Sequence, residues 1–156
     1  MTHVPLYDDF AEGYDLMTDW PARLAAEAAF FQRLFAQHGV RSVLDTACGT
    51  GQHALEFARW GLQVTATDLS EAMIDWARND GGGRTEDGGD ATIGNPQSAI
   101  GNPQFLVAGF GEHAAKTPGP FDAVTCLGNS LPHVLESDAL DAALADFRAV
   151  LKPGGL

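Results

Sequence analysis

Hydrophobic positions along the chain alternate between the spacing of amphipathic helices and the short apolar runs of buried strands. A spacing of three to four residues predicts helices at 21–38, 52–60, 70–78 and 137–151. Short apolar runs predict strands at 42–44, 63–67, 105–108 and 123–127. Because strands and helices alternate, we expect an α/β fold: a Rossmann-like, doubly wound parallel sheet in the order 3-2-1-4, with helices on both faces.

The ends of the predicted helices carry recognisable signals. Pro21 lies in a first turn, Gly39 follows a last turn, and the Ser70 hydroxyl is placed to accept a hydrogen bond from a first-turn N–H. On the last helix the spacing predicts one buried face, made of Leu140, Leu144, Phe147 and Leu151.

One segment, at about 80–104, interrupts this alternation. It reads DGGGRTEDGGDATIGNPQSAIGNPQ, with a near-duplication of ATIGNPQ in SAIGNPQ. So few large apolar groups cannot offset the entropy of ordering so much glycine, and we therefore expect a flexible surface insertion within a single domain, 1–156. A loop expansion without a role is favoured over a lid, because the repeat holds no charged or aromatic anchor.

Composition excludes several classes of function. The formal net charge of −12 argues against a nucleic-acid partner. No apolar run approaches the roughly 20 residues of a membrane span, and the N-terminus lacks the features of a signal peptide, which indicates a cytoplasmic protein with no membrane partner. Cys48 and Cys126 lack zinc-ligand spacing, so no metal is expected.

The stretch VLDTACGTGQH, residues 43–53, carries the first candidate chemistry. Gly49 and Gly51 stand where a strand turns into a helix, so a ligand can approach unpaired backbone N–H groups closely. Together with Ala54, the run also fits the G-x-G-x-x-G/A pattern of NAD-binding proteins. Asp68 ends the next strand, where a carboxylate can accept hydrogen bonds from ribose hydroxyls. Asp45 disfavours a pyrophosphate and favours a cationic cofactor such as S-adenosylmethionine.

Four motifs in order resemble those of the class I S-adenosylmethionine-dependent methyltransferases. VLDTACGTGQHALEFARWG and VTATDLSEAMIDWAR resemble the first two motifs, and FDAVTCLGNSLPHV and ALADFRAVLKPGG resemble the fourth-strand motif and the segment before the fifth strand. CLGNSLPHV is also similar to the corresponding segment of glycine and sarcosine N-methyltransferases.

The resemblance implies a set of contacts with S-adenosylmethionine. The methionine part would be surrounded by residues of the first motif, the ribose bound by the acid after the second strand, and the adenine covered by the helix that follows. A residue at the end of the fourth strand and an N-terminal tyrosine, together with Tyr7, would complete the pocket. These residues are Asp45, Ala47, Gly49, Gly51, Asp68, Leu69, Met73, Leu127 and Tyr14.

Two polar residues after the fourth strand are candidates for catalysis. His133 could take the proton of an amine acceptor or orient it, or it could simply pack at the start of a connection. Asn129 could orient the acceptor or the amino end of the cofactor, or serve as a turn residue.

Two departures from the family pattern affect these expectations. Phe110 stands where the family commonly has an acid that binds adenine, and Glu112 or a backbone carbonyl could replace it. The chain stops at Leu156, where the fifth strand should begin, so we expect a fold truncated after the fourth strand and its helix. The fourth strand would then be an exposed edge, prone to self-association.

Three functions therefore remain open. The first is methyl transfer from S-adenosylmethionine to a small molecule, and the resemblance suggests an amine as the acceptor. The second is a cofactor-binding remnant without turnover, and the third is an NAD-dependent oxidoreductase. Because rate depends on an enclosed and oriented acceptor, we expect cofactor binding with slow or undetectable methyl transfer.

Overall fold

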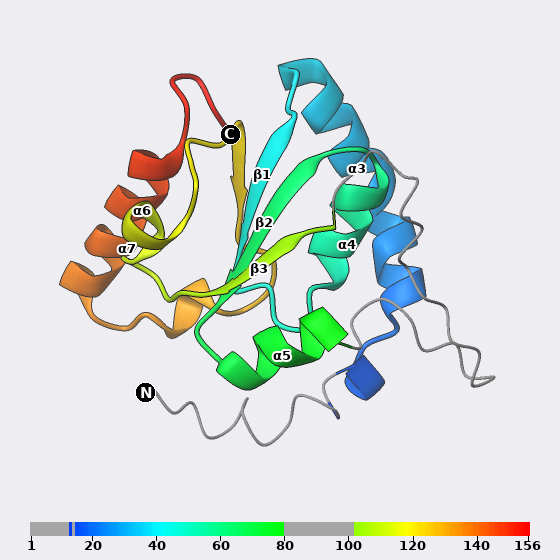
Figure 1. Cartoon of the computed structure of the whole chain (residues 1–156), viewed down its shortest axis with the longest axis horizontal. Coiled ribbons are helices and arrows are strands. Elements are labelled where there is room, and N and C mark those ends of the chain that lie inside the picture. Colours follow the sequence, from blue (N-terminus) through cyan, green and yellow to red (C-terminus); the bar gives the residue numbers. More distant parts are fainter. Residues whose placement is uncertain (1–12, 14, 80–101) are drawn as a thin grey trace.

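A four-stranded parallel sheet forms the centre of the computed structural model, which describes residue 13 and residues 15–79 and 102–156 (Figure 1). The strands are β1 (Ser42–Thr46), β2 (Gln63–Asp68), β3 (Gln104–Val107) and β4 (Ala123–Thr125). Their order is β3-β2-β1-β4, and each neighbouring pair is parallel. The predicted sheet order is confirmed. The predicted insertion at 80–104 falls outside the described residues except at its end, where Gln104 already begins β3.

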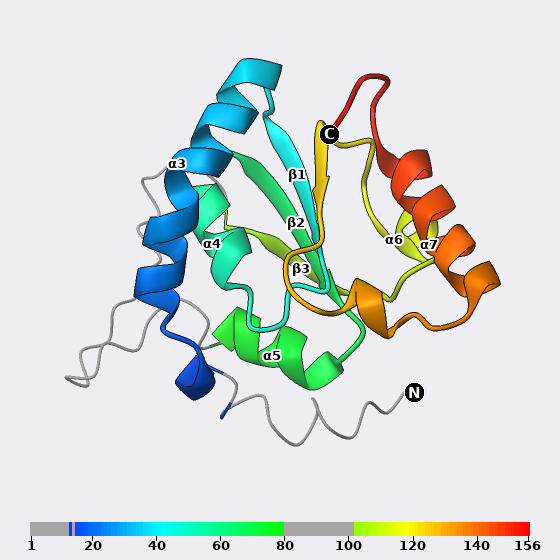
Figure 2. The ribbon, with the colours of Figure 1, turned by 180° about the vertical axis from the view of Figure 1, so that it is seen from behind.

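Helices cover both faces of this sheet. The longer ones are α3 (Trp20–His38), α4 (Gln52–Arg59), α5 (Glu71–Asn79) and α7 (Ser137–Val150). Short ones are η1 (Asp15–Met17), α6 (His113–Lys116) and η2 (Leu131–His133). Figures 1 and 2 show α3 and α4 on one side of the sheet and α6 and α7 on the other. The long helices confirm those predicted from the hydrophobic spacing. The short helices were not predicted, because three or four residues are too few to show a helical period.

Alternate side chains of β1 divide between two hydrophobic cores. Val43 packs with Phe57 and Ile74 in the core under α3, α4 and α5. Leu44 points to the other face and packs with Phe121 and Val150. This alternation follows from the two-residue period of a strand, and both Val43 and Leu44 are fully buried. The sheet is therefore buried on both faces, as a parallel sheet requires.

Local hydrogen bonds define the ends of the helices. Asp19 caps α3, since its carboxylate accepts the backbone N–H of Ala22 at 3.1 Å. Gly39 ends α3 in the left-handed conformation, at φ 63°. The Ser70 hydroxyl accepts the N–H of Met73 at 3.2 Å, which confirms the predicted cap of α5.

The buried face of α7 differs from the prediction. Leu144 is 48 % exposed, and the buried residues are Ala143, Asp146 and Val150. Asp146 faces inward because its carboxylate accepts the backbone N–H groups of His113 and Ala114 and contacts the His113 ring. The hydrophobic spacing treats every acidic residue as exposed, so it could not identify a buried face that contains Asp146.

The edge of the sheet at β4 is partly covered, which corrects the expectation of an exposed edge. Val124 donates its N–H to the carbonyl of Leu156 at 2.9 Å, and Leu156 donates to Asp122 at 3.0 Å. Phe121 and Lys152 make two further backbone hydrogen bonds between the two segments. Residues after α7 thus run beside the beginning of β4.

Candidate binding site

The loop between β1 and α4 has an unusual backbone. Ala47, Gly49 and Gly51 all have positive φ, at 52°, 55° and 80°. Glycine adopts this conformation without strain. A Cβ atom on Gly51 would also lie 2.7 Å from the ring of Phe105, so packing as well as backbone conformation requires glycine there.

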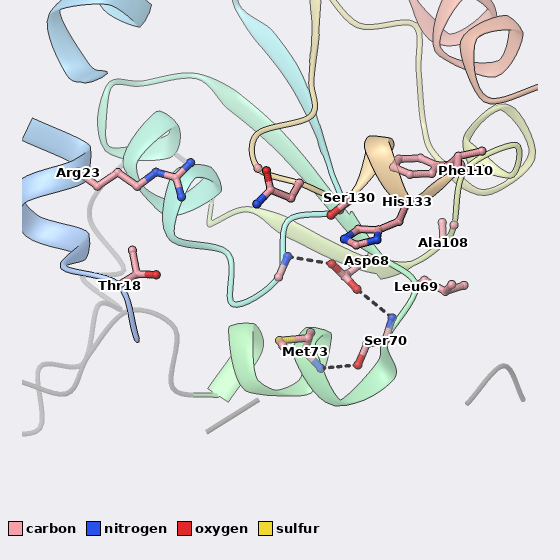
Figure 3. Close-up of a pocket in the computed structure, with 16 residues that line it drawn as sticks. Thr18, Arg23, Asp68, Leu69, Ser70, Met73, Ala108, Phe110, Ser130 and His133 are labelled. Carbon is pink, nitrogen blue, oxygen red and sulfur yellow. Dashed lines mark hydrogen bonds between the residues drawn. The ribbon is translucent and has the colours of Figure 1, made fainter. Parts of the chain in front are cut away.

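Asp68, at the end of β2, ties this loop to the start of α5. One carboxylate oxygen accepts the N–H of Gly49 at 2.9 Å, and the other accepts the N–H of Ser70 at 2.9 Å (Figure 3). The two segments meet because β1 and β2 are parallel neighbours and their carboxyl ends lie at the same edge. The expected proximity of Gly49 and Asp68 is confirmed.

A pocket of about 670 Å³ lies at this edge, within the usual range for small-molecule sites. Figure 3 shows Thr18 and Arg23 on one side of it, Leu69, Ala108 and Phe110 on the opposite side, and Asp68 between them. The complete lining consists of Thr18, Arg23, Ala47, Gly49, Asp68, Leu69, Ser70, Met73, Ala108, Gly109, Phe110, Gly128, Asn129, Ser130, His133 and Val134.

Most of the described residues singled out from the sequence lie on this lining, and three do not. The residues on the lining are Ala47, Gly49, Asp68, Leu69, Met73, Asn129 and His133. Asp45 and Gly51 are buried and do not line it, and Leu127 packs against the core under α3 and α4. Tyr7 and Tyr14 lie outside the described residues.

Asp45 is a buried acid behind the glycine loop. It is 2 % exposed, and the Thr125 hydroxyl donates to its carboxylate at 2.8 Å. Burial raises the pKa of Asp45 to about 7, and the nearby charge of Asp68 adds to the rise, whereas the hydrogen bond from Thr125 opposes it. Asp45 therefore changes charge near neutral pH.

Arg23 and Thr18 are pocket residues that sequence reasoning missed. Arg23 lies in the first turns of α3, where its Nε donates to Glu27 at 3.1 Å and its guanidinium lies 5.2 Å from the centre of the Trp20 ring. No sequence motif marks a lone arginine on an amphipathic helix. Only the packing of α3 beside α4 brings this cation to the pocket.

The wall after β3 is apolar. Phe110 packs edge-on against Phe147, with ring centres 5.6 Å apart. Glu112 does not line the pocket, since its carboxylate accepts the N–H of Gly109 at 2.8 Å and contacts Lys116 at 2.9 Å. Glu112 thus fixes the backbone of this wall, and the geometry does not support it as a direct replacement for the missing acid.

His133 and Asn129 lie on the segment between β4 and α7. His133 ends η2, and its backbone N–H donates to Ser130 at 3.1 Å. Both side chains line the pocket and are exposed to solvent.

The described residues contain neither a cluster of metal ligands nor a membrane-spanning helix. In residues 15–79 and 102–156, no group of three or more His, Cys, Asp or Glu side chains could hold a metal ion. No helix in this part of the chain is long and apolar enough to cross a membrane.

Comparisons with known proteins agree on one kind of domain. Residues 43–155 match the family model described as "Methyltransferase domain". The glycine/sarcosine N-methyltransferase of Parasynechococcus marenigrum (strain WH8102) is 37% identical over 149 residues, covering 96% of this chain and 48% of that protein. The chain spans about half the length of the curated relatives it matches.

Solved structures give the same result for the fold. The CcbJ methyltransferase from Streptomyces caelestis superposes with a TM-score of 0.69 at 25% identity, covering 96% of this chain and 54% of that one. A structure described as a DhpI-SAM-HEP complex superposes with a TM-score of 0.65 at 26% identity, covering 96% of this chain and 59% of that one.

Proposed function

The chain belongs to the methyltransferase domain family, and from this premise we propose that it binds S-adenosylmethionine and directs its methyl group to a small amine. The observation that carries the proposal is the order of groups along the pocket: a guanidinium, a glycine loop, a carboxylate and an apolar wall. An amino-acid part, a ribose and an adenine follow one another in the same order along this cofactor.

Each part of the pocket suits the group proposed for it. Arg23 would pair with the carboxylate of the cofactor, because a guanidinium binds carboxylates well. Asp68 would accept hydrogen bonds from the ribose hydroxyls. Leu69, Met73 and Phe110 would enclose the adenine, whose flat faces favour apolar contacts.

Electrostatics favour this cofactor over NAD. Asp45 and Asp68 both lie at the carboxyl ends of the central strands, next to the glycine loop. The Asp68 carboxylate, and that of Asp45 when it is ionised, disfavour the negative pyrophosphate of NAD and attract an ammonium or a sulfonium. Bound S-adenosylmethionine supplies a methyl group that is already activated by the positive sulfur.

The residues between β4 and α7 would serve the acceptor. A methyl acceptor must be a neutral amine, so a group that accepts its proton helps the reaction. His133 would accept that proton or orient the amine, and Asn129 would position the amine by hydrogen bonding. Relatives named glycine/sarcosine N-methyltransferase support a small amine as the acceptor class.

The proposal also covers location and assembly. We place the chain in the cytoplasm, with no nucleic-acid partner because of its net charge of −12. Self-association would use the part of the β4 edge beyond the residues that pair with 150–156. Light scattering on the purified chain measures this directly.

Calorimetry tests the cofactor. We expect S-adenosylmethionine and S-adenosylhomocysteine to bind and NAD to give no heat of binding. Binding of NAD alone would contradict the proposal. A tritiated-methyl transfer assay with glycine and sarcosine then separates an enzyme from a cofactor-binding domain without turnover.

A pair of histidine variants tests the acceptor side. Where the wild-type chain gives a measurable rate of methyl transfer, His133→Ala should lower it by about 10²-fold or more, the usual contribution of a general base, while the Kd for S-adenosylhomocysteine stays unchanged. His38→Ala is the matched control, since His38 is an exposed residue at the end of α3. Equal rates of methyl transfer for the two variants would show that His133 takes no part in catalysis.

A further inference from the structure

The carboxylate of Asp15 receives hydrogen bonds from four side chains on separate parts of the fold. One oxygen accepts the indole N–H of Trp20 at 2.8 Å and the hydroxyl of Thr50 at 2.6 Å. The other accepts the amide of Gln52 at 3.2 Å and the indole N–H of Trp76 at 3.3 Å. One acid thus connects η1, α3, the glycine loop with the start of α4, and α5.

This carboxylate is the main attachment of η1 to the rest of the described structure. None of the residues of η1 is buried, and Leu16 and Met17 are 89 % and 70 % exposed. Hydrophobic packing therefore contributes little to the position of this segment. The segment nevertheless leads directly into Thr18, which lines the pocket.

A chain of contacts leads from Asp15 to Arg23. Asp15 holds the indole N–H of Trp20, and the ring of Trp20 lies 5.2 Å from the guanidinium of Arg23. The same ring packs edge-on against His53, which contacts Glu27 at 2.7 Å, and Glu27 holds the Nε of Arg23. Fixing the indole therefore restricts where the guanidinium can lie.

We propose that Asp15 is a positioning residue which, through Trp20, holds Arg23 at the amino-acid end of the cofactor pocket. The inference rests on the proposed function, because it takes Arg23 as the partner of the cofactor carboxylate. It also assigns a direction: Asp15 affects binding at this end of the pocket more than at the adenosine end, around Asp68 and Leu69.

Two ligands that differ only at one end test this direction. S-adenosylhomocysteine has the amino-acid part, and 5′-methylthioadenosine lacks it. Asp15→Asn keeps the shape but replaces one acceptor oxygen by an NH₂ group, so donors lose their partner. We expect the Kd for S-adenosylhomocysteine to rise by about tenfold or more, and the Kd for 5′-methylthioadenosine to change by less than about twofold.

Two further variants make the test specific. Asp75→Asn is the matched control, because Asp75 is an exposed acid on α5 that contacts Arg78 at 3.3 Å. It should leave both Kd values unchanged. Trp20→Phe keeps an aromatic ring but removes the indole N–H, so combining it with Asp15→Asn should add little to either single effect.

The tryptophan indole resonances report the contact without any ligand. In a ¹H–¹⁵N spectrum, Asp15→Asn should shift the indole N–H signals of Trp20 and Trp76. The indole signal of Trp60, which donates to Glu56 at 3.1 Å, should not move. Unshifted signals of Trp20 and Trp76 would contradict the contact on which the inference depends.

The outcomes separate this inference from the proposed function. If the wild-type chain binds neither ligand, the proposed function fails and the inference fails with it. If the wild type binds both, and Asp15→Asn binds both equally well or weakens both equally, the inference alone is overturned, since equal weakening indicates general structural damage.

Discussion

At the scale of the residue, Asp45 and Asp68 lie on neighbouring strands but have different environments. Asp45 is buried behind the glycine loop, whereas Asp68 lines the pocket and accepts backbone N–H groups from Gly49 and Ser70. Solvation decides the difference, since a buried carboxyl resists ionisation. The two acids should therefore respond differently to substitution.

Asp68→Ala should weaken the binding of S-adenosylhomocysteine by about 1–3 kcal/mol, because ribose hydroxyls would lose their acceptor. Titration calorimetry measures the change, and Asp75→Ala, an exposed acid on α5, serves as the control. A Kd that matches the wild type would exclude Asp68 from the site.

Asp45→Asn should change how stability depends on pH. The pKa of Asp45 is raised to about 7 by burial, so the folded chain holds a proton that the unfolded chain releases above its ordinary pKa of 3.8. This stabilisation is present at low pH and is lost as pH rises through about 7, at roughly 1.4 kcal/mol per pH unit between the two values.

Urea unfolding at about pH 5 and about pH 8 measures this effect. The stability of Asp45→Asn relative to the wild type should increase with pH, because asparagine does not ionise. Asp141 is an exposed acid on α7, and the stability of Asp141→Asn should change with pH as that of the wild type does. If the stability of Asp45→Asn instead changed with pH as that of the wild type does, Asp45 would be ionised throughout this range.

At the scale of the element, α7 is held to the fold by a polar contact within its apolar face. His113 is fully buried, its Nδ1 lies 2.6 Å from the Asp146 carboxylate, and its Nε2 lies 3.1 Å from the Thr67 hydroxyl. This network joins α6, α7 and β2. A buried network of this kind specifies how the helices dock as long as every member has a partner.

Asp146→Ala should therefore destabilise the fold by about 3–5 kcal/mol, since the buried N–H groups of His113 and Ala114 would lose their acceptor. Leu144→Ala, an exposed position on the same helix, should change stability by less than about 0.5 kcal/mol. Urea unfolding of both variants checks the pair. A larger loss of stability for Leu144→Ala would show that Leu144 packs in the hydrophobic face predicted from the spacing.

At the scale of the whole molecule, one carboxylate links segments that are far apart in sequence. Asp122 accepts the backbone N–H groups of Arg41 and Ser42, each at 2.9 Å, and the ammonium of Lys152 at 2.7 Å. It thereby joins the start of β1, the start of β4 and the turn after α7. The hydrogen bond from Lys152, and then those from Arg41 and Ser42, hold the pKa of Asp122 well below its usual range.

Asp122→Asn should destabilise the chain by about 1–3 kcal/mol at pH 7, the usual contribution of hydrogen bonds to a charged group. Because the pKa is lowered on folding, this stabilisation is present above the unfolded pKa of 3.8 and is lost as pH falls below it. The gap between wild type and variant should narrow at about pH 3.5. A gap that is constant with pH would show that the charge of Asp122 is not involved.

The sequence by itself determined the order of the elements and the chemistry of the central loop. Apolar spacing located α3, α4, α5, α7 and all four strands to within a few residues. These features are readable because they are local: a helix has a period of 3.6 residues, a strand of two, and a glycine loop between them has few alternatives. The roles proposed from the resemblance for Asp45 and Leu127 place them at the site, and these roles remain predictions.

The tertiary structure alone decided which distant residues meet. It brought Arg23 to the pocket, turned Asp146 inward, packed Leu127 against the core, and gathered four donors around Asp15. The physical reason is the same in each case. A polar side chain has a favourable place either in water or beside a partner, and the partner becomes available only when elements far apart in the chain pack together.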